Sequence, residues 1–287
     1  MESALQVKDL CKAYKGTNFK LQNVSFTIPK GSIMGFVGKN GAGKSTTINT
    51  ILNIIQKDSG EVTFFGQQMT DRSTSLRDRI GVVFDAVNFS GELTPQKLEK
   101  VLNDIYKNWD ANLFFAYLER FGIPQNKKIK TFSRGMTMKL SISVALSHKA
   151  MLLILDEATA GLDPVVREEI LDVFLEFVEH EENSILISSH ISSDLEKISD
   201  YITFINNGKI ILAEKKDTLI YEYGIARMKQ SDFEKLGKSE FLASRKRGLQ
   251  LEVLVQDKNA FTKKHPNILV DHATIDELLS LLTREER

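Results

Sequence analysis

The stretch Gly38-Lys39-Asn40-Gly41-Ala42-Gly43-Lys44-Ser45 decides the fold. Its glycines allow a tight backbone turn whose N–H groups point at one centre, where they can hold a phosphate. The spacing matches the phosphate-loop pattern, in which the lysine reaches the outer phosphates and the serine hydroxyl binds Mg²⁺. An apolar run, Ile33–Val37, precedes the loop, and a helical pattern at Thr46–Ile55 follows it. This order of strand, loop and helix places a positive helix end at the bound anion.

A second apolar run, Met151–Leu155, ends in the acid pair Asp156-Glu157. In open α/β sheets ligands bind beyond the carboxyl ends of the strands, so both acids are expected near the nucleotide. Asp156 can hold Mg²⁺ through a water, and Glu157 can accept a proton from an attacking water. Acids after a strand can also simply cap the next helix, but beside a phosphate loop that interpretation becomes the minor one.

Beyond these motifs, strand patterns alternate with helical patterns. Strands are expected at Glu61–Phe65, Ile80–Phe84 and Ser184–Ser188, and helices at Met136–Ser147 and Pro164–Glu179. This alternation implies a mostly parallel sheet that is covered on both faces. We therefore expect an α/β fold of the phosphate-loop NTPase class with a RecA-like parallel core. Short strands over about residues 4–30 would form an antiparallel β subdomain.

A helical insertion is expected in the middle of the chain. Thr94-Pro95 places a capping residue before a first-turn proline, and apolar residues follow at helical spacing. Asp110 can cap a second helix, for which Gly122 is the stop. We expect this helical subdomain at about residues 86–150.

The pattern changes again near residue 217. Leu249, Leu251, Val253 and Val255 alternate with mostly polar residues, as in a half-buried strand. Thr274 and Glu277 form a capping box ahead of an amphipathic stripe, which consists of Ile275, Leu278, Leu279 and Leu282. We interpret residues 217–287 as a small accessory α/β domain that follows an ATP-binding domain at 1–216.

The composition excludes several classes of protein. Lys plus Arg number 38 and Asp plus Glu also number 38, so net charge gives no support to a nucleic-acid partner. Cys11 is the one cysteine, which excludes a disulfide within the chain and suits a reducing cytosol. No apolar run approaches the roughly 20 residues of a membrane-spanning helix, and residues 1–9 lack the apolar core of a secretory signal. If the protein serves a membrane, we expect another chain to span it.

Further segments narrow the class of NTPase. Phe132-Ser133-Arg134-Gly135-Met136 lies shortly before the acid pair, Ala160-Gly161-Leu162-Asp163 follows it, and His190 ends a strand. These segments resemble the signature motif, the D-loop and the switch histidine of ATP-binding-cassette (ABC) ATPases. Tyr14 resembles the aromatic residue that stacks on adenine in that family. The resemblance covers about residues 4–215, and the motifs occur in the family's order.

The resemblance implies a head-to-tail pair of identical or sister chains with two ATP molecules between them. One chain would bind ATP and Mg²⁺ with Tyr14, Gly38, Lys39, Asn40, Gly41, Ala42, Gly43, Lys44, Ser45, Thr46 and Asp156. Glu157 and His190 of that chain would be catalytic, with His190 helping to hold Glu157 and the water. The partner would contribute Ser133 and Gly135 at a helix N-terminus, and Asp163 belongs to the same nucleotide site. Mg²⁺ is expected at Ser45, Asp85 and Asp156.

The chain departs from the family pattern at two places. The signature has Phe132, Arg134 and Met136 where the family usually has Leu, Gly and Gln, and Asp85 stands where the family's Q-loop glutamine is expected. An aspartate is shorter than glutamine and anionic, so it can hold the metal through a water or fall short of it. We predict that Asp85 still senses the nucleotide.

These departures and the appended region resemble ATPase subunits of ABC-2-type exporters, and more narrowly the Gram-positive subunits that handle peptides or antibiotics. The resemblance implies a subunit on the cytoplasmic face of the cell membrane that powers a separate permease and touches the membrane only through it. The alternative is a soluble ABC ATPase that acts in repair, translation or assembly. The short interval from Ser45 to Ser133, the single cassette and the lack of cysteine clusters disfavour most such proteins. Glu157 argues against a nucleotide switch without turnover.

Overall fold

The computed structural model describes residues 2–70, 72–85 and 89–283. β3 (Ile33–Val37) is buried along its whole length and runs directly into the phosphate loop. α1 (Lys44–Ile51) begins at the end of that loop. α1 starts and ends earlier than the sequence pattern predicts. It stops because Asn53 adopts a left-handed backbone with φ of 57°, which a right-handed helix cannot contain.

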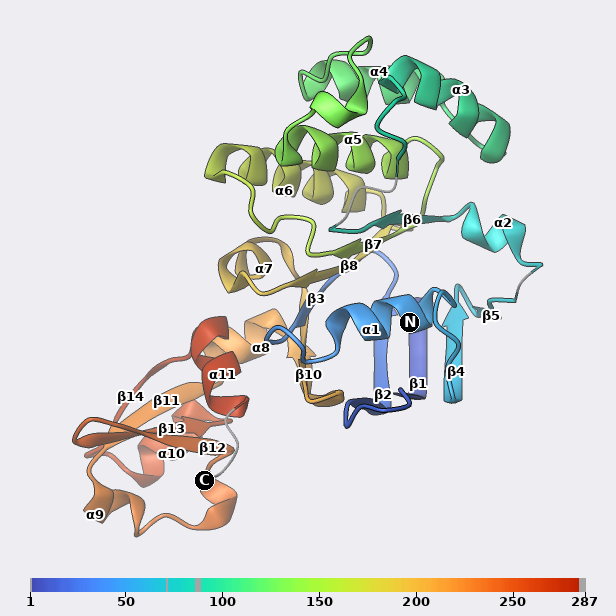
Figure 1. Ribbon diagram of the computed structural model, residues 1–287. Coiled ribbons are helices and arrows are strands. Elements are labelled where there is room, and N and C mark those ends of the chain that lie inside the picture. Colours follow the sequence, from blue (N-terminus) through green and yellow to red (C-terminus); the bar gives the residue numbers. More distant parts are fainter. Residues whose placement is uncertain (1, 71, 86–88, 284–287) are drawn as a thin grey trace.

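β3 lies inside a six-stranded sheet of the described residues, with the order β10-β9-β3-β8-β7-β6. The strands from β9 to β6 pair in parallel, and β10 joins the edge in the antiparallel sense (Figure 1). Their bounds are Ile80–Val83 for β6, Leu152–Asp156 for β7, Ser184–Ser189 for β8, Tyr201–Asn206 for β9 and Lys209–Lys215 for β10. The mostly parallel sheet expected from the sequence is confirmed, and its phosphate loop and acid pair share one edge.

Alternate residues of β3 serve two cores on opposite faces of this sheet. Ile33 and Val37 join the apolar cluster that includes the helices α5 to α7, whereas Met34 and Phe36 join the cluster beneath α1. The second cluster is closed by an antiparallel sheet of β1 (Ser3–Ala13), β2 (Lys20–Pro29), β4 (Ser59–Phe64) and β5 (Gln67–Gln68). β1 and β2 are longer than the short strands expected there, because they pair with each other over most of their length.

Helices cover the sheet face that carries Ile33 and Val37, and some of these helices form the insertion. Thr94 caps α3 by accepting the N–H of Lys97, and Asp110 caps α4 by accepting that of Leu113, as the sequence predicts. The helices of this region are α2 (Thr74–Arg77), α3 (Pro95–Ile105), α4 (Ala111–Arg120), η1 (Ile129–Thr131), α5 (Arg134–Leu146), α6 (Pro164–Val178), α7 (Ser192–Ile198) and α8 (Lys216–Tyr221). α3 and α4 lie on the far side of α5 from the sheet (Figure 1). The expected start of the insertion, residue 86, lies outside the described residues.

A second α/β unit, here called the C-terminal module (residues 217–283), follows β10. Its antiparallel sheet has the order β12-β13-β11-β14. The elements are β11 (Gly224–Met228), α9 (Gln230–Phe233), η2 (Lys238–Glu240), β12 (Ala243–Arg247), β13 (Gln250–Val255), α10 (Lys258–Lys264), β14 (Leu269–His272) and α11 (Ile275–Leu282). The capping box of Thr274 and Glu277 starts α11 as predicted.

Both faces of β13 are buried, which corrects the half-buried strand expected here. Leu254 joins the apolar cluster shared with the ATPase core, while Val253 and Val255 join a separate cluster with Phe261 of α10. Leu249 is 95% exposed, because it lies in the turn before β13 rather than in the strand. On α11 the fully buried stripe is Ile275, Leu278 and Leu281, whereas Leu279 and Leu282 are only partly buried.

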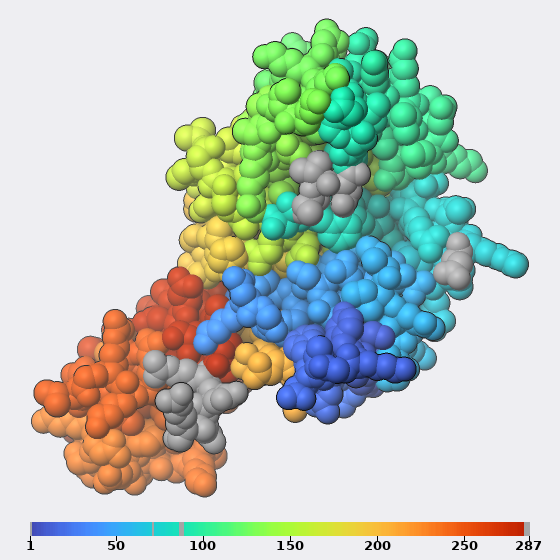
Figure 2. Space-filling model, viewed as in Figure 1, coloured from blue at the N-terminus to red at the C-terminus, as the bar shows by residue number. Residues whose placement is uncertain are grey.

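α11 joins the module to the ATPase core. It packs against α7, whose Glu196 side chain accepts the backbone N–H of Ile275 at 2.8 Å. Leu195 of α7 and Leu278 of α11 belong to one apolar cluster. Figure 2 shows the module as a lobe that projects from one end of the molecule. The helices of the described residues include none with the length and apolar character needed to span a bilayer.

Candidate nucleotide-binding site

The phosphate loop is shaped by glycines that no other residue could replace without a shift. At Gly38 a Cβ would lie 2.6 Å from the carbonyl oxygen of Ile205 on β9. Gly41 and Gly43 adopt φ of 81° and 116°, in the left-handed range that favours glycine. The loop closes through the Ala42 N–H, which donates to the Lys39 carbonyl at 3.0 Å. The N-terminus of α1 follows this loop at once, an arrangement that suits anion binding.

Lys44 is buried although it carries a charge, with 5% of its side chain exposed. Its ammonium donates to the Gly38 carbonyl at 2.7 Å and lies 3.1 Å from Oε1 of Glu157. A buried lysine requires such partners because an unpaired buried charge is costly. Of these two partners of Lys44, the Glu157 carboxylate is the one that a phosphate can replace.

The acid pair is positioned by the neighbouring strand. Asp156 is the last residue of β7 and pairs in register with Ser188 of β8. The Ser188 hydroxyl donates to Oδ1 of the buried Asp156 at 2.6 Å and accepts the Glu157 N–H at 3.1 Å. Ser188 was not singled out from the sequence. Its place at the end of a strand beside the acid pair is the signal that points to it, but only the strand order shows that the two ends are adjacent.

Glu157 bridges the phosphate loop and the switch histidine. Its Oε2 lies 2.6 Å from Nδ1 of His190, and its Oε1 faces Lys44. Glu157 adopts φ of 55°, an uncommon backbone for a residue with a side chain. Such strain persists where the surrounding structure holds it, and here it turns the carboxylate back over the loop. The predicted base and the predicted switch residue are therefore in direct contact.

The two departures from the family pattern meet each other. Asp85 follows β6, and Arg134 is the first residue of α5. The guanidinium of Arg134 pairs with the carboxylate of Asp85 across the mouth of the site. It also lies beside Gly161, where a Cβ would come 3.2 Å from Arg134 Cζ. Arg134 therefore faces the nucleotide site of its own chain.

A cavity of about 800 Å³ gathers these groups, and we call it the nucleotide cavity. The predicted residues that line it are Lys39, Asn40, Gly41, Gly43, Lys44, Ser45, Thr46, Asp85, Glu157 and His190. The other lining residues are Phe19, Arg134, Ala160 and Gly161. The predicted residues outside this lining are Tyr14, Gly38, Ala42, Ser133, Gly135, Asp156 and Asp163. Gly38 and Ala42 belong to the loop itself, and Asp156 lies buried behind Glu157.

Phe19 is the aromatic residue that lines the cavity, and sequence reasoning missed it. Its ring lies where a Cβ at Gly43 would meet it at 3.1 Å. Tyr14 is half-buried before the β1–β2 turn, with the ammonium of Lys12 5.8 Å from its ring centre. The sequence did not point to Phe19, because the pairing of β1 with β2 decides which aromatic side chain of this turn lies near the phosphate loop.

Ser133 and Asp163 cap helices within their own chain. The Ser133 hydroxyl accepts the Met136 N–H at the start of α5, and Asp163 accepts the Val166 N–H at the start of α6. Gly135 lies in the first turn of α5, near Leu162 and Val166. These residues therefore form an adjacent surface of helix N-termini outside the cavity, which suits a contact with a nucleotide held by a second chain.

The oxygens around the cavity fit a hard divalent cation. Mg²⁺ takes oxygen ligands and binds proteins through one or two carboxylates together with substrate phosphates. Ser45 and Asp85 line the cavity, and the Asp156 carboxylate lies behind it. Within the described residues no group of three or more His, Cys, Asp or Glu side chains forms a metal cage. The donor set fits a metal that arrives with the nucleotide.

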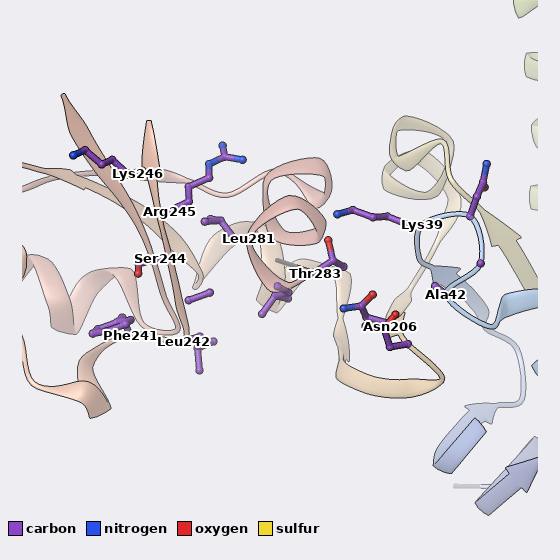
Figure 3. Close-up of a pocket in the computed structure, with 15 residues that line it drawn as sticks. Lys39, Ala42, Asn206, Phe241, Leu242, Ser244, Arg245, Lys246, Leu281 and Thr283 are labelled. Atoms are coloured by element: carbon purple, nitrogen blue, oxygen red, sulfur yellow. The ribbon is translucent and has the colours of Figure 1, made fainter. Parts of the chain in front are cut away.

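A second hollow, here called the outer cleft, separates the phosphate loop from the C-terminal module. It has a volume of about 1140 Å³ and is lined by Lys39–Ala42, the turn at Asn206 and Asn207, β12 and the end of α11. Figure 3 shows Lys39 extending from the loop toward the end of α11, where Thr283 lies. The module thus stands directly beside the nucleotide loop.

Comparisons with known proteins agree with this geometry. The ABC transporter family matches residues 21–160. The bacitracin transport ATP-binding protein BcrA of Bacillus licheniformis is 33% identical over 213 residues, which cover 74% of this chain and 69% of that protein. The lantibiotic transport ATP-binding protein SrtF of Streptococcus pyogenes is 35% identical over 215 residues, 74% of this chain and 91% of its own length.

Solved structures agree with the fold. A solved ATP-binding subunit of an ABC transporter superposes with a TM-score of 0.70 and 27% identity, over 76% of this chain and 92% of its own. A dimeric cassette bound to ADP and phosphate, MJ0796, shares the fold with a TM-score of 0.67 over 74% of this chain and 98% of its own, at 23% identity. With the phosphate loop, the acid pair and the histidine assembled in one cavity, the chain belongs to the ATP-binding proteins of the ABC transporter family and is an ABC ATPase.

Proposed function

We propose that this chain binds MgATP in the nucleotide cavity, hydrolyses it with Glu157 and His190, and powers a separate membrane permease. The observation that carries the proposal is the set of contacts from Lys44 through Glu157 to His190. These contacts bring a cation, a carboxylate and an imidazole together beside the phosphate loop, which supports roles in phosphate binding, proton acceptance and orientation. A structural ion pair would not need all of these at the carboxyl edge of a parallel sheet.

The resting contacts suggest how substrate switches the site on. Lys44 now neutralises Glu157. Phosphate oxygens of ATP would take over the Lys44 ammonium, which leaves Glu157 free to accept a proton from water. The contact with His190 would hold the released carboxylate in place and return it to the same position in each cycle. Glu157 would thus be free to act as a base only when ATP occupies the site.

The metal would be held by residues of this chain and by the nucleotide. When bound, Mg²⁺ would offset the charge that builds up on the phosphate oxygens. We assign Ser45 to direct contact and Asp156 to contact through a water, with the Ser188 hydroxyl orienting the Asp156 carboxylate. Asp85 faces the cavity from the opposite side and completes the set.

A second copy or a sister chain would complete the site. Ser133 and Gly135 lie at the N-terminus of α5, and Asp163 lies at that of α6. Positive helix ends attract anions, and these lie next to the cavity without entering it. We propose that they reach the γ-phosphate of ATP held by the partner, while Tyr14 or Phe19 contacts the adenine. The cassette MJ0796, which shares this fold, is a dimer with bound ADP and phosphate, and this supports a paired arrangement.

The relatives that transport peptide antibiotics support a proposal for the cargo class. BcrA is a bacitracin transport protein and SrtF a lantibiotic transport protein. We propose that this chain drives export of peptides, antibiotics or other amphipathic compounds from the cytoplasmic face of the membrane. We further propose two domains, an ATP-binding domain at 1–216 and an accessory domain at 217–287. The packing of α11 on α7 supports a role in stabilising the core or the dimer.

The test is Glu157→Gln, compared with the unaltered chain. We expect the variant to bind MgATP, to lose roughly 10²- to 10⁴-fold in hydrolysis rate, as loss of a general base does, and to accumulate as closed dimers in size-exclusion chromatography. Glu179→Gln, on an exposed glutamate at the end of α6, is the control and should hydrolyse normally. Full turnover by Glu157→Gln would remove Glu157 from the mechanism. Affinity purification from native membranes should recover a polytopic protein, and its absence would argue against transport.

A further inference from the structure

Asp85 and Arg134 join two parts of the fold that lie at opposite sides of the nucleotide cavity. Asp85 follows the edge strand β6, and Arg134 begins α5, the central helix of the insertion. Their ion pair is half exposed, with 54% and 51% of the side chains accessible. Exposed pairs of this kind contribute little to stability. The pair therefore explains little about how the fold is held together, although it spans the mouth of the site.

Two ion pairs line the nucleotide cavity. Lys44 pairs with Glu157, and Arg134 pairs with Asp85. In each set the cation suits phosphate oxygens and the carboxylate suits a metal or its water. A nucleotide with its metal carries both complementary charges at once. Such a ligand can therefore replace both partners of each pair.

The surroundings of Arg134 leave its guanidinium room to move. Gly161 lies under it, and a Cβ there would crowd Arg134 Cζ at 3.2 Å. The pair is also open to water on its outer side. An exposed and weakly stabilising pair is easily exchanged for a multiply charged ligand.

We propose that Asp85 and Arg134 form an electrostatic gate, which MgATP opens by giving each partner a better one. Arg134 turns from Asp85 to the phosphates, and Asp85 turns to the metal or its water. Because Asp85 follows β6 and Arg134 begins α5, opening the gate removes one ion pair between the core and the insertion when MgATP binds. This gate rests on the proposed function, since it requires that the cavity takes MgATP. Both residues would contact the nucleotide or its metal, so their role is in binding.

The gate is tested by a double-mutant cycle of nucleotide binding. Asp85→Asn, Arg134→Gln and the double variant are titrated with the non-hydrolysable analogue AMP-PNP, with and without Mg²⁺. We expect Arg134→Gln to weaken metal-free binding roughly fivefold, as loss of one charged contact does. Asp85→Asn should tighten metal-free binding and reduce the benefit of added Mg²⁺, because the competitor for Arg134 and a ligand for the metal are both lost.

Non-additivity is the decisive outcome. Asp85→Asn should tighten metal-free binding more in the presence of Arg134 than in the Arg134→Gln background, by roughly threefold or more. Equal factors in both backgrounds would overturn the gate. A merely structural pair would change the melting temperature and leave the Mg²⁺ dependence of binding untouched, so melting curves are recorded for each variant.

The matched control is the pair Arg120–Glu176. It also joins an arginine of the insertion to a carboxylate of the core, with 38% and 49% of the side chains exposed, but it does not line the cavity. Arg120→Gln, Glu176→Gln and their double variant should bind AMP-PNP as the unaltered chain does. If the unaltered chain bound AMP-PNP no better than Lys44→Ala, the proposed function itself would fail. Intact binding with an additive cycle would overturn the gate alone.

Discussion

The nucleotide cavity and the C-terminal module each contain a network of charged side chains, and the two networks are built differently. In the cavity Lys44 and Glu157 are mostly buried, but they face a hollow of about 800 Å³. In the module Glu252 on β13 is 2% exposed and is surrounded by Arg227, Arg245 and Arg247. One network borders the space where a ligand can enter, whereas the other, here called the closed network, surrounds a carboxylate that is buried in the module.

This difference teaches what each network is for. Burial alone would raise the pKa of Glu252, but hydrogen bonds from Arg245 and Arg247 outweigh it and lower that pKa. Glu252 is thus held ionised by partners that no ligand displaces. Glu157 holds Lys44 and His190 by contacts that a phosphate or a water can take over. The ion pairs that a ligand can displace lie at the nucleotide cavity, whereas the ion pairs around Glu252 stabilise the fold of the module.

The largest expected effect separates the two networks by activity. His190→Ala should lower the ATPase rate roughly 10²- to 10⁴-fold, because Glu157 loses the group that orients it. The melting temperature should stay close to that of the unaltered chain, since His190 is half exposed. Phosphate release and thermal melting measure the two quantities. His180→Ala, on an exposed histidine, is the control. Equal ATPase rates for the two variants would show that His190 has no role in hydrolysis.

The next effect is on stability and lies in the module. Glu252→Ala should lower the free energy of unfolding by about 3–5 kcal/mol, because it removes the carboxylate that pairs with the mostly buried Arg245. The ATPase rate per folded molecule should be unchanged. Chemical denaturation measures the loss, and Arg247→Gln is the control, since Arg247 is 70% exposed and should cost less than about 1 kcal/mol. A stable Glu252→Ala variant would mean that the closed network does not hold the module.

Ser188 contributes both to the nucleotide site and to the stability of the fold, so its loss should affect both. Ser188→Ala removes the hydroxyl that orients Asp156, so we expect about 1–2 kcal/mol of lost stability together with a weaker response of the ATPase to Mg²⁺. Ser184→Ala, at the other end of β8, removes a buried hydroxyl that bonds to Pro29 and Gly31. That control should lose similar stability and keep its Mg²⁺ dependence. Parallel Mg²⁺ titrations of the two variants decide the matter.

The smallest effect is a pH dependence confined to the module. Lys264, His265 and the Gly237 N–H bond to Glu240 and lower its pKa to about 2. A carboxylate with a depressed pKa in the fold stabilises it above the ordinary pKa and loses that contribution as the pH falls. Between pH 4.5 and about 2 the melting temperature should therefore fall more steeply for the unaltered chain than for Glu240→Gln. Glu234→Gln, in the same module, should follow the unaltered chain.

Local patterns were enough to predict much of the fold. The phosphate loop, the acid pair after β7 and the helix caps at Thr94, Asp110 and Thr274 depend on residues close in sequence, and the structure has each of them. Element ends were less well predicted, because they depend on single left-handed residues. Phe65, with φ of 50°, ends β4 one residue earlier than expected.

The remaining features required segments that are distant in sequence to meet. Ser188 reaches Asp156 only because β8 lies beside β7, and Phe19 lines the cavity only because β2 passes the phosphate loop. The burial of Glu252 depends on α11 covering one face of the module's sheet. Sequence alone showed Asp85 and Arg134 as separate departures from a family pattern.

The sequence by itself determined that this chain carries a phosphate loop and an acid pair after an apolar strand, because such motifs need fixed residue types at short spacings. Tertiary structure alone decided which charges are neighbours, because charge pairs act over a few ångströms in space whatever their separation along the chain. It therefore showed that Lys44 rests on Glu157, that Arg134 rests on Asp85, and that the C-terminal module stands beside the phosphate loop.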